Sequence, residues 1–281
     1  MIYIPDEIID RFIKEDVPYI DLTTLVMGIG GQPGKMEFFC RENAVLCGTE
    51  EVLRVFERLN IKKIDSKPSG TLLEPGEVFL RAEGKAEALH MAWKVSLNIL
   101  EYCSGIATRT KKLVDLAGSV NPGITVVTTR KTFPGTKELA VKSVLAGGGF
   151  PHRLGLSETV LIFKQHLNFG GSLDDFIGTL NRVKSQACEK KIIVETENLE
   201  DALKLCRGGV DGIQFDKVPV SELKTYIERI RNSYPGVTLL AAGGINEKNI
   251  VEYARTGVNA IVTTSVYFGR PVDMSVRIEK T

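Results

Sequence analysis

Residues 124–135 read ITVVTTRKTFPG. The apolar, β-branched run that opens this stretch is typical of a strand that is buried on both faces. Two adjacent cations, Arg130 and Lys131, follow the run directly, and a Phe-Pro-Gly turn comes next. A pair of cations at the end of a buried strand suggests that a negatively charged group meets them there.

Short apolar strand candidates alternate with helical patterns from about Thr125 onward. We expect strands at ITVVTT, ETVLIF, KIIVET, DGIQFD, VTLLAA and AIVTTS, and helices at KELAVKSVLA, LDDFIGTLNRVKSQA, NLEDALKLCR, SELKTYIERIRNSY and EKNIVEYARTG. Apolar residues in these helical patterns recur at intervals of three and four. The alternation predicts an α/β fold, in which helices cover a parallel sheet that is either a closed barrel or an open doubly wound sheet.

The chain before about residue 105 has a different pattern. Strands are expected at KMEFFCREN, AVLCG and GEVFLRAEG, and a helix is expected at TEEVLRVFERLN. A long helix, KAEALHMAWKVSLNILEYCSG, is expected to stop at Gly105. We therefore predict an α+β unit in this region and place a domain boundary near Gly105.

Composition excludes several classes of protein. The 281 residues are 43% hydrophobic, and 36 Lys and Arg nearly balance 35 Asp and Glu, so no basic face for nucleic acid is indicated. The apolar runs are too short to span a bilayer, and acidic residues near the N-terminus argue against a signal peptide. The five cysteines and three histidines have no metal-binding or disulfide spacing. We expect a cytoplasmic protein without a transition metal.

Chemistry in parallel α/β folds gathers at the carboxyl ends of the strands. Each predicted strand end carries groups that bind an anion or a cation: Arg130 and Lys131; Lys164, Gln165 and His166; Glu195; Asp216; Gly243 and Gly244; Thr264 and Ser265. A polar loop after three glycines, AGGGFPHRLGL, adds His152 and Arg153.

Two of these strand ends carry carboxylates, Glu195 and Asp216. They could cap the helices that follow, but Asn198 and Ser221 are better placed for that role. Two carboxylates that face each other across a site repel unless a cation lies between them, and Mg²⁺ prefers oxygen ligands. We therefore predict that both bind Mg²⁺.

The glycine pair at 243–244 precedes a predicted helix, and such turns bind phosphate through backbone N–H groups and the helix dipole. The hydroxyls of Thr264 and Ser265 would complete this phosphate site. Cations, paired carboxylates and a phosphate cradle together indicate a phosphorylated, polyanionic small molecule as the ligand. Its charge would explain Arg130 and Lys131.

Several motifs resemble those of the quinolinate phosphoribosyltransferase (nicotinate-nucleotide diphosphorylase) family. They are T-R-K-T-x-P-G (129–135), G-G-G-x-x-H-R-x-G-L (147–156), S-G-I-A-T-R-T (104–110), V-E-T-E-x-L-E (194–200), D-G-I-Q-F-D (211–216), A-G-G-I (242–245) and Y-A-R-T-G-V (253–258). The resemblance covers most of the chain in the right order.

The resemblance implies a type II phosphoribosyltransferase. Residues 1–105 would form an N-terminal α/β sandwich that 267–281 rejoin, and 106–266 would form an incomplete α/β barrel of six or so strands. Members transfer ribose 5-phosphate from 5-phosphoribosyl 1-diphosphate to the nitrogen of quinolinate, with Mg²⁺ and with loss of CO₂. They are homodimers, or multiples of them, whose active sites are built from two subunits.

The family's residue roles can be carried over to matching positions. Arg130, Lys131, His152 and Arg153 would line the anionic substrate pocket, with Lys164 and His166 also expected there. Glu195 and Asp216 would hold Mg²⁺ and the ribose hydroxyls, and Gly243, Gly244, Thr264 and Ser265 would hold the 5-phosphate. We expect Lys131, Glu195 and Asp216 to take part in catalysis.

Some positions depart from the family pattern. Lys94 stands where the family has an arginine that is offered to the neighbouring subunit, and Phe163 replaces a lysine that contacts quinolinate. Lys164 would then fall on the opposite face of the strand. Thr128 and Ala242 also differ. Because the phosphate and metal side is mostly kept and the dicarboxylate side is altered, the pattern resembles the ModD branch, which is associated with molybdenum transport.

Other functions remain open at this point. An aldolase or synthase barrel would need a desolvated lysine, but Lys131 and Lys164 have many charged neighbours. A non-catalytic sensor of an oxyanion or nucleotide would not need a catalytic metal site. The presence of Glu195 and Asp216 therefore argues against this function. An authentic quinolinate phosphoribosyltransferase of NAD synthesis is the third alternative. The acceptor is not identified by the sequence.

Overall fold

In the computed structural model, which describes residues 2–281, the chain divides into two units. Unit 1 comprises Met1–Lys111, Thr132–Gly148 and Tyr267–Thr281. Unit 2 comprises Lys112–Lys131 and Gly149–Val266. In the described part of the chain, no helix is both long and apolar enough to cross a membrane.

Unit 1 is built on an antiparallel sheet with the strand order β13-β1-β5-β3. The strands are β1 (Pro33–Cys40), β3 (Lys62–Ser66), β5 (Val78–Lys85) and β13 (Met274–Lys280), and β2 (Ala44–Val45) pairs separately with β4 (Leu72–Leu73). Strand β13 lies along β1 from the pair Gly34↔Lys280 to the pair Cys40↔Met274. The end of the chain therefore returns to the sheet of the first unit.

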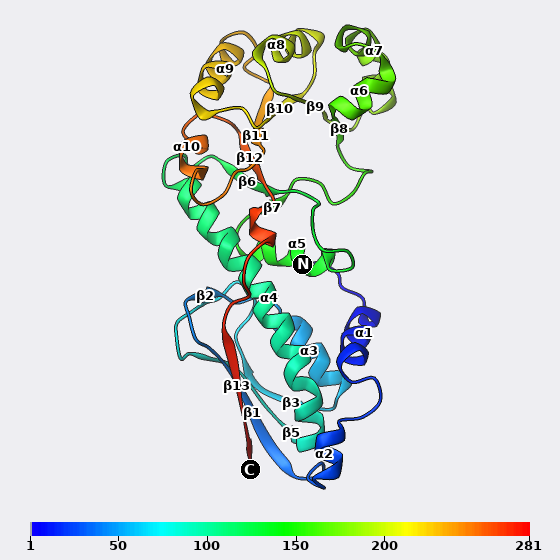
Figure 1. Cartoon of the computed structure of the whole chain (residues 1–281), viewed down its shortest axis with the longest axis vertical. Helices are drawn as coiled ribbons and strands as arrows, with labels where there is room; N and C mark the ends of the chain where they lie inside the picture. Colours follow the sequence, from blue (N-terminus) through cyan, green and yellow to red (C-terminus); the bar gives the residue numbers. More distant parts are fainter. Residues whose placement is uncertain (1) are drawn as a thin grey trace. The chain divides into compact units, whose positions relative to one another are not determined.

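Unit 1 also contains helices that bury an apolar face against this sheet. They are α1 (Asp6–Asp16), α3 (Thr49–Arg58), α5 (Lys137–Ala146) and the greater part of α4 (Ala86–Gly118), whereas the short helix α2 (Leu22–Val26) buries only Thr24 (Figure 1). The ring of Phe38 on β1 lies 6.3 Å from the ring of Phe56 on α3 and 6.4 Å from that of Phe79 on β5. These three aromatic side chains are fully buried, so they form the centre of the core.

The prediction that the long helix stops at Gly105 is wrong, because α4 continues to Gly118. A Cβ atom at Gly105 would lie 3.3 Å from the carbonyl oxygen of Arg270 and 3.3 Å from Cα of Pro271. The glycine thus allows a distant segment to approach the helix closely, and it does not end the helix.

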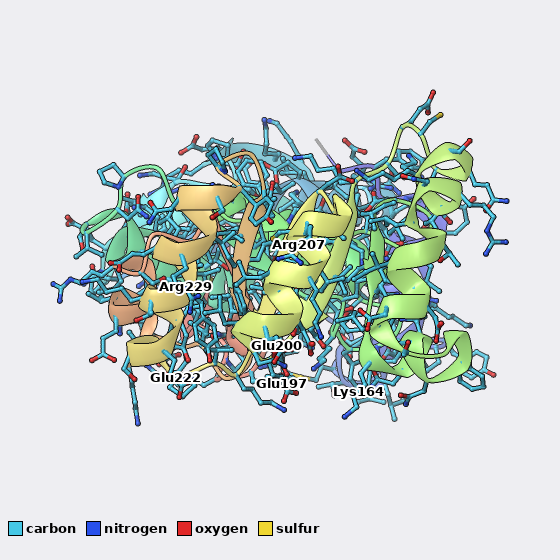
Figure 2. All side chains as sticks on the ribbon, turned by 90° about the horizontal axis from the view of Figure 1, so that it is seen from above. Lys164, Glu197, Glu200, Arg207, Glu222 and Arg229 are labelled. Atoms are coloured by element: carbon cyan, nitrogen blue, oxygen red, sulfur yellow. The ribbon has the colours of Figure 1, made fainter. Side chains whose placement is uncertain are left out.

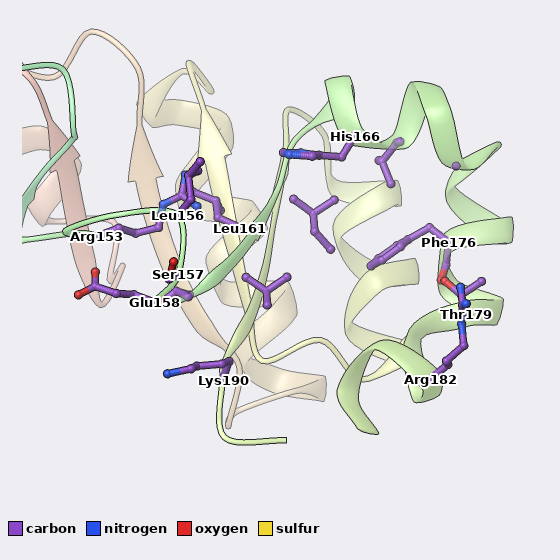
Figure 3. A pocket seen from close by; sticks show the side chains of 15 residues that line it. Arg153, Leu156, Ser157, Glu158, Leu161, His166, Phe176, Thr179, Arg182 and Lys190 are labelled. Atoms are coloured by element: carbon purple, nitrogen blue, oxygen red, sulfur yellow. The ribbon is translucent and has the colours of Figure 1, made fainter. Parts of the chain in front are cut away.

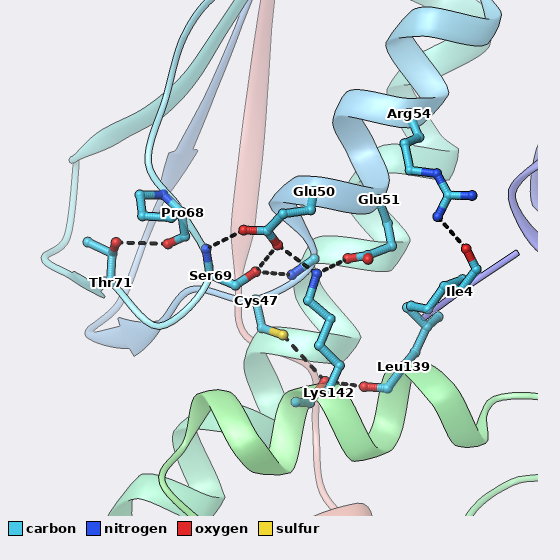
Figure 4. Close-up of polar contacts among 12 residues, drawn as sticks. Ile4, Cys47, Glu50, Glu51, Arg54, Pro68, Ser69, Thr71, Leu139 and Lys142 are labelled. Atoms are coloured by element: carbon cyan, nitrogen blue, oxygen red, sulfur yellow. Dashed lines mark hydrogen bonds and ion pairs between the residues drawn. The ribbon is translucent and has the colours of Figure 1, made fainter. Parts of the chain in front are cut away.

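A partly buried ion-pair network attaches α5 to the rest of unit 1 (Figure 4). The ammonium of Lys142 lies 2.6 Å from Glu50 and 2.5 Å from Glu51. Burial opposes ionisation of Glu50, but hydrogen bonds from Lys142 and Ser69 outweigh it and lower the pKa of Glu50 to about 2. Because Glu51 is buried, the pairing with Lys142 compensates its charge.

Unit 2 is a parallel sheet with the strand order β7-β6-β12-β11-β10-β9-β8. Its strands are β6 (Thr125–Thr128), β7 (Phe150–Pro151), β8 (Val160–Ile162), β9 (Ile192–Thr196), β10 (Gly212–Asp216), β11 (Thr238–Ala242) and β12 (Ala260–Thr263). The first and last long strands, β6 and β12, are paired, whereas β7 and β8 remain as two edges. The sheet is therefore an incomplete barrel, as expected, with one additional two-residue strand.

Helices α7 (Leu173–Gln186), α8 (Leu199–Gly208) and α9 (Val220–Ser233) cover the outer side of this sheet (Figure 1). Figure 2 shows Glu200 and Arg207 at opposite ends of α8, where their charges complement the helix dipole. The side chain of Asn198 accepts a hydrogen bond from the backbone N–H of Asp201 at 2.9 Å, so its predicted capping role is confirmed.

Three local predictions in unit 2 are wrong. Helix α9 starts at Val220 without a side-chain cap, so Ser221 lies inside the helix and does not cap it. Strand β8 stops at Ile162, and Lys164 begins the short helix α6 (Lys164–Gly170) and so is not on a strand face. Helix α10 (Ile250–Ala254) begins several residues after the glycine pair. The glycine turn therefore does not open directly into a helix, and the helix-dipole argument for phosphate binding does not apply there.

Candidate active site

A cavity of about 470 Å³ lies within unit 2 at the carboxyl ends of its strands. Side chains alternate between the two faces of a strand, so Ile193 and Glu195 point inward while Ile192 and Val194 pack outward. The predicted site residues that line this cavity are Arg130, Lys131, His152, Arg153, Glu195, Asp216, Gly243, Gly244, Thr264 and Ser265. The structure therefore brings together most of the residues selected from the sequence.

The cationic side of the cavity is formed by residues that follow β6 and β7. Arg130 and Lys131 are exposed at the rim, whereas Arg153 is half-buried and its guanidinium lies 5.9 Å from the centroid of the Phe163 ring. Burial and the nearby charge of Arg130 lower the pKa of Arg153, although an arginine remains protonated. Because these guanidinium groups repel each other, an anion bound between them would be stabilised.

His152 contributes a neutral imidazole to this side. Burial, and then the charge of Arg153, lower its pKa to about 4. Its Nε2 atom is buried, and no described residue forms a hydrogen bond with it. At neutral pH the ring is therefore uncharged and keeps one nitrogen available for a ligand.

Glu195 and Asp216 form the acidic side. Burial raises the pKa of Glu195, a hydrogen bond from Gln214 lowers it, and the charges of Asp216 and Glu197 raise it further. The mutual repulsion of Glu195 and Asp216 shows that these carboxylates lie close enough to interact. A divalent cation between them would remove this repulsion.

The two carboxylates suit Mg²⁺ better than a transition metal. Among residues 2–281 no group of three or more His, Cys, Asp and Glu side chains could hold a metal ion. Mg²⁺ commonly uses one or two carboxylates and completes its coordination with water and substrate phosphates. The donor set therefore fits an ion that binds together with a phosphorylated substrate.

A glycine turn and a hydroxyl group form the third side. Gly243 and Gly244 have φ angles of +90° and +73°, which favour glycine. A Cβ atom at Gly244 would meet nothing within 4 Å, so a ligand can approach this backbone closely. At the end of the adjacent strand β12, the hydroxyl of Thr264 lies 2.9 Å from that of Thr129.

Three predicted binding residues are placed elsewhere. Lys164 is exposed at the start of α6 and is not among the described residues that line this cavity. The Nδ1 atom of His166 accepts a hydrogen bond from the backbone N–H of Phe163 at 3.0 Å, which caps α6. Lys94 belongs to unit 1, where its ammonium lies 4.8 Å from the centroid of the Trp93 ring.

His166 instead lines a second cavity of unit 2, which has a volume of about 490 Å³. Figure 3 shows this cavity between the β8 region, with Arg153, Glu158 and Leu161, and the Phe176 side of α7. Arg153 and Leu161 line both cavities. The two spaces therefore share a wall at the β8 edge of the sheet.

Gln214 and Lys217 are among the polar residues of the main cavity that the sequence analysis did not select; Thr129, Asn246 and Thr263 are the others. Lys217 has a φ angle of +56°, and its ammonium lies 3.7 Å from the carboxylate of Asp216. Its position directly after a strand-end aspartate could have identified it. Gln214 lies within the strand, and a polar residue between apolar ones in DGIQFD was the available signal.

The chain matches both halves of one enzyme family. Residues 106–277 match the C-terminal domain of quinolinate phosphoribosyl transferase, and residues 21–104 match the N-terminal domain of that enzyme. The two matched regions together cover most of the chain.

Individual relatives extend this similarity over the full length. A protein of Pasteurella multocida that carries the name pyrophosphorylase ModD is 35% identical over 280 residues, which cover 100% of this chain and 99% of that protein. A protein of Methanothermobacter thermautotrophicus named nicotinate-nucleotide pyrophosphorylase [carboxylating] is 32% identical and covers 97% of this chain and 98% of its own length. The crystal structure of nicotinate-nucleotide pyrophosphorylase from Ehrlichia chaffeensis has a TM-score of 0.90, with 28% identity over 99% of this chain and 100% of that one.

Proposed function

Because this chain belongs to the quinolinate phosphoribosyltransferase family, we propose that it transfers ribose 5-phosphate from 5-phosphoribosyl 1-diphosphate to the ring nitrogen of a heteroaromatic acid. The chain is a phosphoribosyltransferase-type enzyme. The observation that carries the proposal is the main cavity of unit 2, where cations, two carboxylates, a glycine turn and hydroxyl groups lie together. Each of these groups matches one part of a sugar phosphate that also carries a diphosphate.

The reaction would be a displacement at C1 of the ribose. The ring nitrogen of the acceptor forms the new bond, and the C1–oxygen bond breaks as its electron pair leaves with the diphosphate. Positive charge develops on the ribose in the transition state, while negative charge develops on the diphosphate. Lys131, at the rim, would stabilise the departing diphosphate, and no side-chain nucleophile is required.

Glu195 and Asp216 would hold Mg²⁺ and orient the ribose hydroxyls. The ion, when bound, would neutralise negative charge on the diphosphate. The Gly243–Gly244 turn and the hydroxyls of Thr264 and Ser265 would hold the 5-phosphate. Fixing both ends of the sugar phosphate would position C1 beside the acceptor, and such positioning lowers the barrier.

The acceptor side of the cavity supports a ligand less charged than quinolinate. Phe163 packs against the apolar interior of the barrel and contributes an aromatic wall. His152 is neutral, so the charge on this side comes from Arg130 and Arg153. We therefore infer that the acceptor is a heteroaromatic acid with fewer, or differently placed, acid groups than quinolinate.

The enzyme would act as a homodimer with shared active sites. Unit 1 exposes an apolar surface formed by Tyr19, Leu22, Leu25, Val26 and Met27, and Trp93 is partly exposed as well. Apolar surfaces of this kind mark interaction sites. Lys94 adjoins Trp93, so it would lie at the interface with a second subunit that covers this surface.

Diphosphate release tests the proposal directly. Purified protein is supplied with 5-phosphoribosyl 1-diphosphate, Mg²⁺ and a panel of pyridine and other heteroaromatic acids, and turnover with at least one acid is expected. Asp216→Asn serves as the inactive control. Absence of Mg²⁺-dependent binding of 5-phosphoribosyl 1-diphosphate, together with no release, would instead support a sensor of oxyanions or nucleotides.

A second candidate function is authentic quinolinate phosphoribosyl transfer in NAD synthesis. It is favoured by the 32% identity to the Methanothermobacter protein named nicotinate-nucleotide pyrophosphorylase [carboxylating]. Efficient turnover of quinolinate in the same assay would establish it. A Schiff-base aldolase has no comparable support, because Lys164 lies outside the cavity and the cavity lysines, Lys131 and Lys217, are exposed and not desolvated.

A further inference from the structure

Gln214 is a buried amide in the otherwise apolar interior of the barrel. Its side chain lies on the wall of the main cavity, and only 4% of the residue is exposed. In the sheet, Gln214 is paired with Glu195 on β9 and with Leu240 on β11. The inward-facing residues of the neighbouring strands β9 and β11 include, besides Glu195, the apolar residues Ile193, Leu240 and Ala242. A polar side chain at this position is therefore not explained by packing.

The orientation of the amide follows from its neighbour. The Nε2 atom of Gln214 donates a hydrogen bond to Oε2 of Glu195 at 2.6 Å, and an ionised carboxylate can only accept. The amide nitrogen must therefore face Glu195, and the amide oxygen must face away from it. This oxygen is buried, and no described residue donates a hydrogen bond to it.

Buried oxygens of this kind nearly always have a hydrogen-bond donor. A ligand that fills the cavity displaces solvent, so it either supplies a donor to Gln214 or leaves the oxygen unpaired. A carboxylate placed there would be repelled by the amide oxygen and by Glu195. The other orphaned atom of the cavity, Nε2 of His152, belongs to a neutral ring and can share a hydrogen bond with an uncharged group.

We propose that Gln214 is a specificity-determining residue whose amide oxygen accepts a hydrogen bond from an amino, hydroxyl or ring N–H group of the acceptor, an aromatic acid with a single carboxylate. This inference rests on the proposed phosphoribosyl transfer and narrows its acceptor class. Arg130 and Arg153 bind the one carboxylate, Phe163 faces the ring, and Gln214 selects for the donor. Quinolinate has two carboxylates and no such donor.

Binding measurements with defined probes test the inference. Calorimetry with Mg²⁺ compares nicotinate, its 2-, 5- and 6-amino derivatives, and quinolinate. At least one amino derivative is expected to bind about ten-fold or more tightly than nicotinate and quinolinate, because sites built around a hydrogen bond discriminate strongly against ligands that lack the partner. If no amino derivative binds more tightly than nicotinate, the inference is wrong.

Gln214→Leu is the decisive variant, since it removes the amide oxygen at nearly constant volume. It also removes the hydrogen bond to Glu195, so binding of 5-phosphoribosyl 1-diphosphate is measured on the same variant. The substitution is expected to bring the affinity for the amino derivatives to within about three-fold of that for nicotinate, both measured on the variant. Gln186→Leu makes the same chemical change on the exposed side of α7 and should have no effect. Gln214→Met is measured in parallel, and thermal unfolding verifies that both variants are folded.

Two outcomes separate this inference from the proposed function. A preference for the amino derivative that survives Gln214→Leu would show that the oxygen is satisfied in another way, for example by water, and would overturn the role of Gln214. Binding of 5-phosphoribosyl 1-diphosphate is measured on the same samples. If the protein binds 5-phosphoribosyl 1-diphosphate but does not prefer an amino derivative to nicotinate, the inference about Gln214 fails and the proposed function stands.

Discussion

The imidazole of His152 is buried beside the guanidinium of Arg153, and both circumstances disfavour a positive charge on the ring. Its pKa of about 4 lies below the usual value of 6.5, so the folded protein resists protonating this residue. The carboxyl group of Glu195 is shifted in the other direction by burial. Burial in the cavity thus favours the uncharged forms of His152 and Glu195. Charge remains on groups that can pair with a ligand.

Stability should therefore fall as the pH is lowered through the range between these two pKa values of His152. Between pH 6.5 and 4 the unfolded chain binds a proton at His152 and the folded chain does not. The contribution of His152 to stability is therefore fully present above about pH 6.5 and is lost as the pH falls toward 4. At pH 4.5 the loss attributable to His152 is about 2–3 kcal/mol. Urea unfolding of the wild type and His152→Gln at pH 7 and 4.5 measures it. An equal loss in both proteins would contradict the assignment.

Neutralising either carboxylate should impair binding of the sugar diphosphate without unfolding the protein. Glu195→Gln and Asp216→Asn each remove a charge while keeping the shape of the side chain. Because the bound ion loses a ligand, Mg²⁺-dependent affinity for 5-phosphoribosyl 1-diphosphate should drop by about ten-fold or more, which is roughly 1.4 kcal/mol. Calorimetry that finds unchanged affinity in both variants would refute the assignment. Glu200→Gln, at the exposed start of α8, is the matched control.

Quinolinate should be a poor substrate for the wild-type protein. Lys94 replaces an arginine of the family pattern, and arginine binds carboxylates more directionally than lysine. Phe163 puts an aromatic wall where the pattern has a lysine, and one lost contact to a buried carboxylate costs on the order of 2–5 kcal/mol. We expect kcat/KM for quinolinate below about 10⁴ M⁻¹s⁻¹, and an increase in the double variant Lys94→Arg with Phe163→Lys. A wild-type value in the ordinary enzyme range would show this interpretation to be wrong.

At the scale of single elements, the turn after β11 shows why adjacent glycines are not equivalent. Both Gly243 and Gly244 have positive φ angles. A Cβ atom at Gly243 would lie 2.5 Å from Cγ of Lys217 and 2.7 Å from Oδ1 of Asp216, whereas one at Gly244 would meet nothing within 4 Å. The first glycine allows the turn to pack against Asp216, and the second leaves space for a ligand.

The two alanine substitutions should therefore differ. Gly244→Ala carries only the cost of the left-handed backbone, about 1 kcal/mol, while Gly243→Ala adds a steric overlap and should cost more than about 2 kcal/mol. Denaturant unfolding measures both free energies. Gly243→Ala should also weaken Mg²⁺-dependent binding, because the overlap displaces Asp216. Equal destabilisation by the two changes would argue against the packing role of Gly243.

At the scale of the whole molecule, shared active sites would connect unit 1 of one subunit with unit 2 of another. Lys94→Ala and Arg130→Ala are each expected to reduce turnover on their own. Mixing the two variants should restore part of the activity, up to about a quarter of the wild-type level if subunits pair at random, because one of the two sites in a mixed dimer is intact. Failure to complement, with subunit exchange verified by mass spectrometry, would count against shared sites.

Much of unit 2 can be predicted from local sequence patterns. Helix α7 spans Leu173–Gln186, one residue shorter than its sequence pattern, and the long strands occupy the expected apolar runs. Periodicity is a local property, and the carboxyl ends of parallel strands necessarily meet at one edge. This is why Arg130, Glu195 and Asp216 could be grouped together although they are far apart in the chain.

Structural features that depend on contacts between distant segments cannot be predicted from local sequence patterns. Gly105 lies inside α4 because the segment at Arg270 packs against it, and β13 finds its partner β1 more than 230 residues away along the chain (Gly34↔Lys280). Lys164 leaves the cavity because β8 ends early, at Ile162. The orphaned oxygen of Gln214 arises only when β9 places Glu195 beside the amide. Side-chain periodicity specifies which face a residue occupies, but contacts across the fold specify which of its atoms remain free to bind.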